Sequence, residues 1–141
     1  MIRERAGNHW RSPIILKDLT FNRDTFSVET TRPQSRQLMV ALEGCADLRV
    51  QSEVATLIHR IHEEARLMNA TTVYVNMDKL EFLSSGCFKS LCTWARLLLS
   101  REAAYKLRIL FNPKYHWQVR SLTALQMLAP DHISVEKIEP R

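Results

Sequence analysis

Glycine is scarce in this sequence: among 141 residues only Gly7, Gly44 and Gly86 occur. The phosphate-binding loops of P-loop and dinucleotide-binding proteins need several glycines at fixed spacing, because only a bare backbone approaches a phosphate closely. Three isolated glycines exclude both kinds of loop. The G-x-S-x-G motif of serine hydrolases is also absent. With only five prolines as well, the composition is not that of a loop-rich or low-complexity chain.

Cysteine is equally rare, and the three cysteines lack the even number and regular spacing of a disulfide framework. Cys87 and Cys92 fall on one predicted helix and cannot pair with each other. We therefore expect a reducing, cytoplasmic setting. No apolar run approaches the ~20 residues of a membrane span, so we expect no membrane partner. The charged stretch from Met1 to Gly7 is not followed by a signal-peptide core, so we expect no secretion signal.

Charge is not concentrated in any block, although the chain has a net charge of +5 and a pI of about 9.4. This basic balance suits an acidic partner. Because no dense Lys/Arg block occurs, nucleic-acid binding is the weaker interpretation. The length fits one domain. We expect a partly flexible N-terminal arm, residues 1–20, of which residues 1–12 are loosely ordered, followed by a domain that spans residues 21–141.

Apolar periodicity predicts alternating strands and helices. Strand patterns occupy residues 26–31, 37–43, 71–77, 106–111 and 133–138. Helical spacing occupies residues 52–68, with Ser52 as the expected cap, 85–100 and 116–129. The first two strands should form a hairpin, and the apolar run at residues 13–16 is either an edge strand or a docked arm. This order predicts an α/β fold: a mixed, mainly parallel sheet of about five strands with about three helices.

The most informative stretch is the junction at Ser84, Ser85 and Gly86, between a buried strand and an apolar helix. The first backbone N–H groups of a helix have no partner inside the helix, and the positive end of the helix dipole lies behind them. Such a position suits a hydroxyl cap or a phosphate group. The simpler interpretation is a structural cap, and the functional interpretation is a phosphorylatable hydroxyl.

Catalytic and metal sites have little support. Cys87 lies at a helix start, which lowers a thiol pKa, but its place in the apolar stripe indicates a small core residue. His59, His62 and Glu63 lack the H-E-x-x-H spacing of zinc proteases, which favours an exposed helix face. We therefore predict no catalytic residue, no metal and no cofactor.

These residues resemble the STAS domain, named for sulphate transporters and anti-sigma factor antagonists. In that family a strand that ends in aspartate precedes an apolar–Phe–apolar approach, then Asp-Ser-(Ser/Thr/Ala)-Gly and a helix. Here VYVNM, Val73 to Met77, precedes LEFLSSGCFKSL, Leu80 to Leu91. A second likeness is LEGCAD, Leu42 to Asp47, which is similar to the family's strand-Gly-x-x-Asp before its first helix. The resemblance covers residues 26–138.

The sequence departs from the family pattern in ways that affect the proposed switch. Asn76 stands where the strand usually ends in aspartate. An alignment without a gap places Ser84 at the motif aspartate, Ser85 at its first serine, Gly86 at the phosphorylated position and Cys87 at the family glycine. An alignment anchored on Gly86 instead makes Ser85 the phosphorylatable residue, with Leu83 at the aspartate. The residues leave both alignments open, and the family's usual final helix is not evident.

The resemblance implies a regulatory protein-interaction module rather than an enzyme. Its expected partner is a serine kinase that doubles as an anti-sigma factor, or a related regulator, and a homodimer stays open. Ser85 and Ser84 are the phosphorylation candidates. The expected partner-binding residues are Asp47, Ser84, Ser85, Gly86, Lys89 and Arg96. The alternative is a small-ligand or nucleotide-binding domain of the same fold without a phospho-switch.

Overall fold

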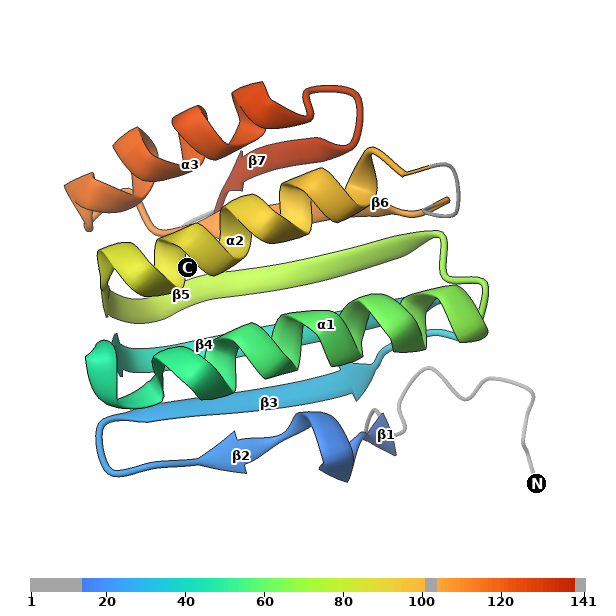
Figure 1. Cartoon of the computed structure of the whole chain (residues 1–141), viewed down its shortest axis with the longest axis horizontal. Coiled ribbons are helices and arrows are strands. Elements are labelled where there is room, and N and C mark those ends of the chain that lie inside the picture. Colours follow the sequence, from blue (N-terminus) through green and yellow to red (C-terminus); the bar gives the residue numbers. More distant parts are fainter. Residues whose placement is uncertain (1–13, 101–103, 139–141) are drawn as a thin grey trace.

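The computed structural model describes residues 14–100 and 104–138. Within them, strands and helices alternate from β4 onward, as the periodicity predicts (Figure 1). The expectation of loose order in residues 1–12 lies outside the described residues. The strands are β1 (Ile14–Ile15), β2 (Phe21–Asn22), β3 (Phe26–Arg32), β4 (Gln37–Ala46), β5 (Thr72–Leu83), β6 (Lys106–Phe111) and β7 (Ile133–Lys137). The helices are η2 (Lys17–Leu19), η3 (Leu48–Val50), α1 (Gln51–Leu67), α2 (Ser85–Leu98) and α3 (His116–Leu128).

The strands form one mixed sheet in the order β1-β3-β4-β5-β6-β7, with β2 also paired to β3. Strands β4 to β7 are parallel, whereas β3 pairs antiparallel with β1, β2 and β4, so the predicted hairpin and mixed sheet are confirmed. In the described part of the chain the sheet has seven strands rather than about five. The two additional strands are two residues long, and so short a segment shows no periodicity of its own; pairing with β3 defines them.

The N-terminal part joins the sheet from Ile14 onward. Ile14 and Ile15 form an edge strand against β3. Leu19 is buried, and its carbonyl accepts a hydrogen bond of 2.6 Å from the Thr30 hydroxyl. The division into an arm of residues 1–20 and a domain of residues 21–141 stays a prediction, although residues 14–20 pack on β3.

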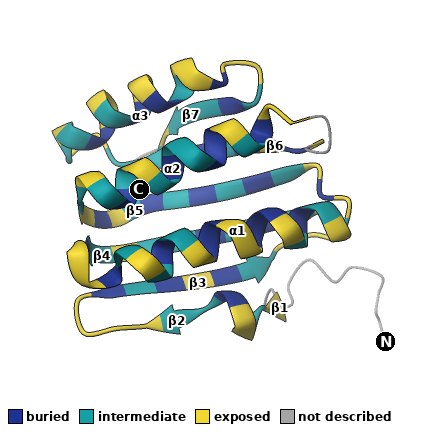
Figure 2. Cartoon of the chain, in the orientation of Figure 1, coloured by how far each residue is buried: buried dark blue, intermediate teal, exposed yellow. Residues whose placement is uncertain are grey.

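The core lies between one face of the sheet and α1, α2 and α3, all of which lie in front of the sheet in Figure 1. Side chains alternate along each strand, so one set is buried and the other faces away from the helices. Figure 2 shows this alternation as bands along the strands and as exposed outer faces of the helices. The buried strand residues are Phe26, Val28, Thr30, Leu38, Val40, Ala46, Val73, Val75, Met77, Leu80, Leu107, Ile109 and Ile133. No helix in residues 14–100 and 104–138 has the length and apolarity to cross a membrane.

Two element boundaries differ from the sequence-based expectation. Strand β5 continues to Leu83 instead of stopping at Met77, because it stays paired with β4 through two register shifts. Across the first shift the next buried residue after Met77 is Leu80, three positions later instead of two. This spacing breaks the alternation that sequence patterns depend on. Helix α1 begins at Gln51, directly after the turn η3, so Ser52 is not its cap.

Candidate functional site at two helix starts

The carboxyl ends of β4 and β5 bring two helix starts together. β4 ends at Ala46, directly before η3 and α1, and β5 ends at Leu83, directly before α2. The backbone N–H of Ser84 donates to the carbonyl of Ala46 over 2.8 Å. The Cys87 thiol lies 3.8 Å from the carbonyl oxygen of Asp47. The topology thus places Asp47, Ser84, Ser85 and Gly86 in one region, as expected for the ends of parallel strands.

The two serines have different roles at the start of α2. Ser84 is the N-cap: its hydroxyl accepts a hydrogen bond of 3.1 Å from the Cys87 N–H, and its carbonyl accepts the Phe88 N–H. Ser85 is the first helical residue, and it is exposed to solvent. The hydroxyl of Ser84 therefore performs the structural role, and the hydroxyl of Ser85 is the accessible one.

Gly86 lies against the first residue of α1. A Cβ on residue 86 would stand 2.0 Å from Gln51 Oε1 and 2.2 Å from Gln51 Cδ. Gln51 Oε1 is a buried atom without a hydrogen-bond partner in the described part of the chain. A side chain at position 86 therefore requires the Gln51 amide to move, and glycine lets the two helix starts approach.

Cys87 is fully buried, with 0% of its surface exposed. Burial raises the pKa of its thiol, because the thiolate loses hydration, and this effect exceeds the opposing effect of the nearby Ser84 hydroxyl. A buried thiol with a raised pKa is a poor nucleophile at neutral pH.

Asp47 is bound within the fold. Its carboxylate caps η3 by accepting the Arg49 N–H over 2.9 Å, and it forms an ion pair with the Arg49 guanidinium at 2.8 Å. The hydrogen bonds from Arg49 lower the pKa of Asp47. Arg49 also donates to the Thr25 hydroxyl, which links this turn to the segment before β3. The Asp47 carboxylate therefore stabilises the turn that lies beside Ser84.

The two expected cations of α2 lie at different distances from the helix start. Lys89 is exposed one turn beyond Ser85, so it borders the junction. Arg96 is exposed too, but it lies about 16 Å further along the helix axis than Ser85 at 1.5 Å per residue. Arg96 donates to the Thr93 hydroxyl, and that hydroxyl donates to the Lys89 carbonyl. Arg96 is therefore not part of the junction.

Exposed apolar side chains lie at the same end of the parallel strands, and the sequence-based site does not include them. Leu48 of η3 is 78% exposed, Phe82 near the end of β5 is 49% exposed, and Val119 in the first turn of α3 is 43% exposed. Trp117 fixes the start of α3 to β5, because its indole N–H donates to the Glu81 carbonyl over 2.9 Å. No local pattern reveals these three side chains as exposed, since tertiary packing alone decides which apolar residues stay uncovered.

The histidine group of α1 does not form a site. His62 is buried, and its Nδ1 lies 2.7 Å from the Tyr105 hydroxyl. His59 is exposed, and Glu63 pairs with Arg66. Among the described residues, no group of three His, Cys, Asp or Glu side chains converges to hold a metal ion.

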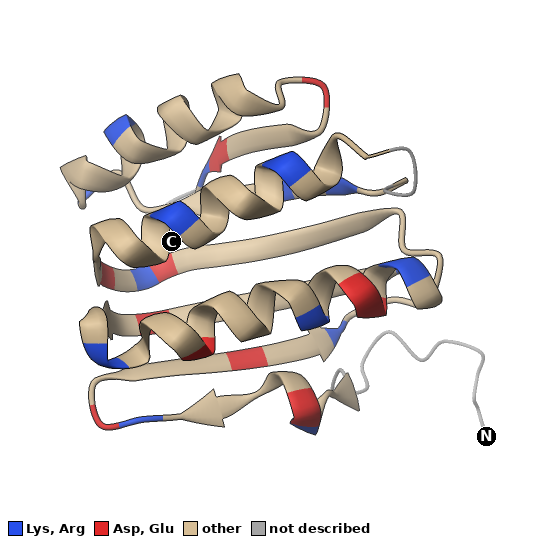
Figure 3. Ribbon diagram, viewed as in Figure 1, with Lys and Arg blue, Asp and Glu red and all other residues tan. Residues whose placement is uncertain are grey.

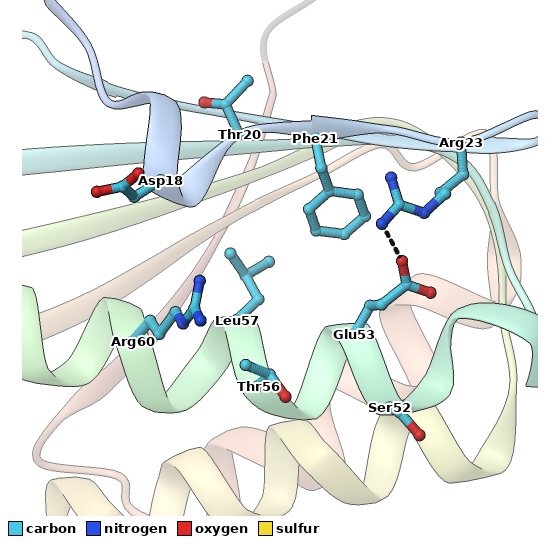
Figure 4. A pocket seen from close by; sticks show the side chains of 9 residues that line it. All are labelled: Asp18, Thr20, Phe21, Arg23, Ser52, Glu53, Thr56, Leu57 and Arg60. Atoms are coloured by element: carbon cyan, nitrogen blue, oxygen red, sulfur yellow. Dashed lines mark ion pairs between the residues drawn. The ribbon is translucent and has the colours of Figure 1, made fainter.

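A separate hollow of about 300 Å³ lies between the N-terminal segment and α1 (Figure 4). An ion pair between Arg23 and Glu53 joins its two walls, and the Arg23 guanidinium stacks over the Phe21 ring at 5.0 Å. The lining residues are Asp18, Thr20, Phe21, Arg23, Ser52, Glu53, Thr56, Leu57 and Arg60. None of the predicted partner-binding residues lines it.

Comparison with solved structures identifies this arrangement. A crystal structure of an anti-sigma factor antagonist from Mycobacterium paratuberculosis superposes with a TM-score of 0.56 and 15% sequence identity, covering 82% of this chain and 88% of that one. The chain has the STAS fold. The anti-sigma factor antagonist SpoIIAA in its unphosphorylated form is also similar, with a TM-score of 0.50, 14% identity and coverage of 81% and 89%. No family model and no curated protein matches the STAS-fold chain in sequence.

Proposed function

We propose that this chain is a non-catalytic, cytoplasmic regulatory module of the anti-sigma factor antagonist type, which docks a protein partner at the start of α2. One observation carries the proposal: an exposed Ser85 hydroxyl stands at a helix start, at the same end of the parallel strands as the exposed apolar residues Leu48, Phe82 and Val119. Exposed apolar groups that are accompanied by polar groups at their rim are typical of protein interfaces. The fold shared with anti-sigma factor antagonists supports the same class of function.

Ser85 is the residue that we propose as the phosphorylation site. Its hydroxyl is exposed, whereas the Ser84 hydroxyl is held by the Cys87 N–H. Position 86 carries no hydroxyl, and the Gln51 amide occupies the space of a side chain there. These contacts favour the alignment anchored on Gly86. A phosphate on Ser85 would add about two negative charges to the docking surface and make its burial under a partner costly.

A serine kinase that also acts as an anti-sigma factor, or a related regulator, is the partner that we propose. The solved relative SpoIIAA is named in its unphosphorylated form, so phosphorylation is a recorded state of that protein. A protein partner fits this surface better than nucleic acid does, because Lys89 is the only cation within one turn of Ser85 on α2 and exposed apolar groups lie at the same end of the fold.

The test incubates the purified chain with co-encoded serine kinases and ATP, and mass spectrometry locates the phosphate. We expect the modification on Ser85, its loss in Ser85→Ala and its retention in Ser84→Ala. Immobilised wild type and Ser85→Asp then capture candidate regulators, and we expect the aspartate variant to bind the regulator more weakly. If no phosphate is found on the protein, the proposed phospho-switch is contradicted. Failure of both proteins to bind a kinase or sigma regulator removes the docking function.

The hollow in Figure 4 favours a second candidate, a domain that binds a small ligand without a phospho-switch. Its volume of about 300 Å³ matches the smaller ligand sites of proteins, and it combines an apolar floor at Phe21 and Leu57 with charged groups at its rim. Calorimetry with nucleotides and inorganic phosphate separates the candidates. The ligand-binding function is supported if the wild type gives a heat of binding and Arg23→Ala and Arg60→Ala abolish it.

A homodimer stays a prediction, which analytical sedimentation tests.

A further inference from the structure

The outer faces of α2 and α3 differ in charge from the rest of the helical layer. Helix α2 carries Lys89 and Arg96, helix α3 carries Arg120, and neither helix contains a carboxylate. All three cations are exposed. Figure 3 shows basic residues without acidic ones on α2 and α3, whereas α1 carries both kinds. Because α2 packs against α3, these cations belong to one surface.

The cations of this surface have no ion-pair partner among the described residues. In residues 14–100 and 104–138, the ion pairs join Arg23 to Glu53, Arg49 to Asp47, Arg66 to Glu63 and Arg108 to Glu136. None of them involves Lys89, Arg96 or Arg120. Among the described residues, the carboxylates nearest to the two helices in sequence are Glu81 and Asp131, and both lie outside the helices.

The outer face of α3 is also unusually apolar for a helix that faces solvent. Val119 is exposed, Met127 is 75% exposed, and Thr123 and Ala124 are exposed between them. A solvent-facing helix normally places charged residues on this side, but here Arg120 is the only Lys, Arg, Asp or Glu on α3. Uncovered apolar groups framed by cations indicate an interaction surface.

We infer that this α2–α3 face (Lys89, Arg96, Val119, Arg120 and Met127) binds an acidic amphipathic helix of the partner protein. The inference rests on the proposed docking function and adds the chemistry of the partner. Carboxylates of such a helix would pair with the three cations, and its apolar side would cover Val119 and Met127. A second copy of this chain is a poor occupant, because a two-fold contact would bring Arg96 and Arg120 of both copies together.

The experiment uses two synthetic amphipathic peptides of about 15 residues, long enough to form a helix against a surface. Both carry leucine on one side, and the other side carries glutamate in one peptide and lysine in the other. Amide chemical-shift mapping at about 0.02 M and 0.2 M salt locates and titrates binding. We expect the glutamate peptide to shift resonances of α2 and α3 and to bind more tightly than the lysine peptide. Its affinity should be lower at the higher salt concentration.

Two variants with the same change in net charge make the test specific. Arg96→Glu with Arg120→Glu should weaken binding of the glutamate peptide about tenfold or more. Lys17→Glu with Arg36→Glu, in η2 and in the turn between β3 and β4, should change binding less than about twofold. Equal weakening by both pairs, or no binding of the glutamate peptide, overturns the inference. So does tighter binding of a single-stranded oligonucleotide to the same face. If a captured sigma regulator binds Arg96→Glu/Arg120→Glu as well as wild type, this inference fails while the docking function stands.

Discussion

The side-chain amide of Gln51, the first residue of α1, occupies the space that a side chain at Gly86 would need, with Oε1 2.0 Å from the position of a Cβ. This contact sets how closely the starts of α1 and α2 approach. It joins the helix that follows the first family-like motif, Leu42 to Asp47, to the second motif, which contains Gly86. It is therefore the tertiary reason for glycine in the Ser84-Ser85-Gly86 junction.

The Gln51–Gly86 contact predicts coupling between the two positions. Gly86→Ala adds a methyl group that displaces the Gln51 amide, which offsets the higher helix propensity of alanine. In a Gln51→Ala background the methyl group meets free space. We expect Gly86→Ala to be more favourable by about 1 kcal/mol in that background than in the wild type. Urea denaturation of the four proteins measures the coupling, and an equal effect in both backgrounds contradicts the contact.

Substitutions of the two serines should differ in their effect on the stability of the protein as well as on its phosphorylation. Ser84→Ala removes the hydroxyl that accepts the Cys87 N–H, so the free energy of unfolding should fall by about 1 kcal/mol, as for other lost helix caps. Ser85→Ala removes an exposed hydroxyl and should change it by less than about 0.5 kcal/mol. Chemical denaturation tests both variants. A larger loss in Ser85→Ala than in Ser84→Ala would reverse the assigned roles.

A buried polar group links α1, α2 and the segment before β6. The Trp94 indole N–H donates to the Tyr105 hydroxyl over 2.8 Å, and that hydroxyl lies 2.7 Å from His62 Nδ1. Burial raises the pKa of Tyr105 to about 12, so the phenol stays protonated. Because its oxygen accepts from Trp94, its hydrogen is available to donate to His62.

Tyr105→Phe should therefore be costly although it removes one oxygen. It leaves the Trp94 N–H without this acceptor and His62 Nδ1 without this donor, and each loss costs about 1 to 2 kcal/mol. We expect a total decrease of about 2 to 4 kcal/mol in the free energy of unfolding, measured by urea denaturation. Tyr74→Phe, on the sheet face away from the helices, is the matched control and should cost less. Equal costs for both variants would contradict the buried network.

The sheet face away from the helices predicts a pH dependence. Arg108 binds the Glu136 carboxylate through two hydrogen bonds of 2.6 and 2.8 Å, and these bonds hold the pKa of Glu136 below its ordinary value of 4.5. A carboxylate with a lowered pKa in the folded state stabilises the fold above its ordinary pKa and loses that contribution as the pH falls through the folded value. The contribution should therefore be complete above about pH 5 and disappear in more acidic solution.

The pair is partly open to solvent, so screening limits it to about 0.5 to 1 kcal/mol. The difference in unfolding free energy between wild type and Glu136→Gln should be constant from neutral pH to about pH 5 and shrink below about pH 4. Denaturation at several pH values measures this difference. In an Arg108→Met background the same substitution should show a much smaller pH-dependent difference, and an unchanged difference would show that another partner lowers the pKa.

Sequence reasoning predicted the α/β class, the hairpin of β3 and β4, the three helices and the mixed sheet, because each depends on periodicity within a short segment. The two-residue strands and the extension of β5 to Leu83 were not predictable in this way. Short pairings and register shifts are defined by the neighbouring strand, and a shift cancels the alternation that marks a strand.

The same division applies to the candidate site. The sequence by itself determined that two serines and a glycine stand between a buried strand and an apolar helix, since local chemistry and spacing suffice for that. Only the tertiary structure decided that Ser84 is the cap and Ser85 the exposed hydroxyl, that Gln51 lies against Gly86, and that Leu48, Phe82 and Val119 stay uncovered. Each of these depends on which segments meet at the ends of the parallel strands, and such contacts between distant residues leave no pattern in either segment alone.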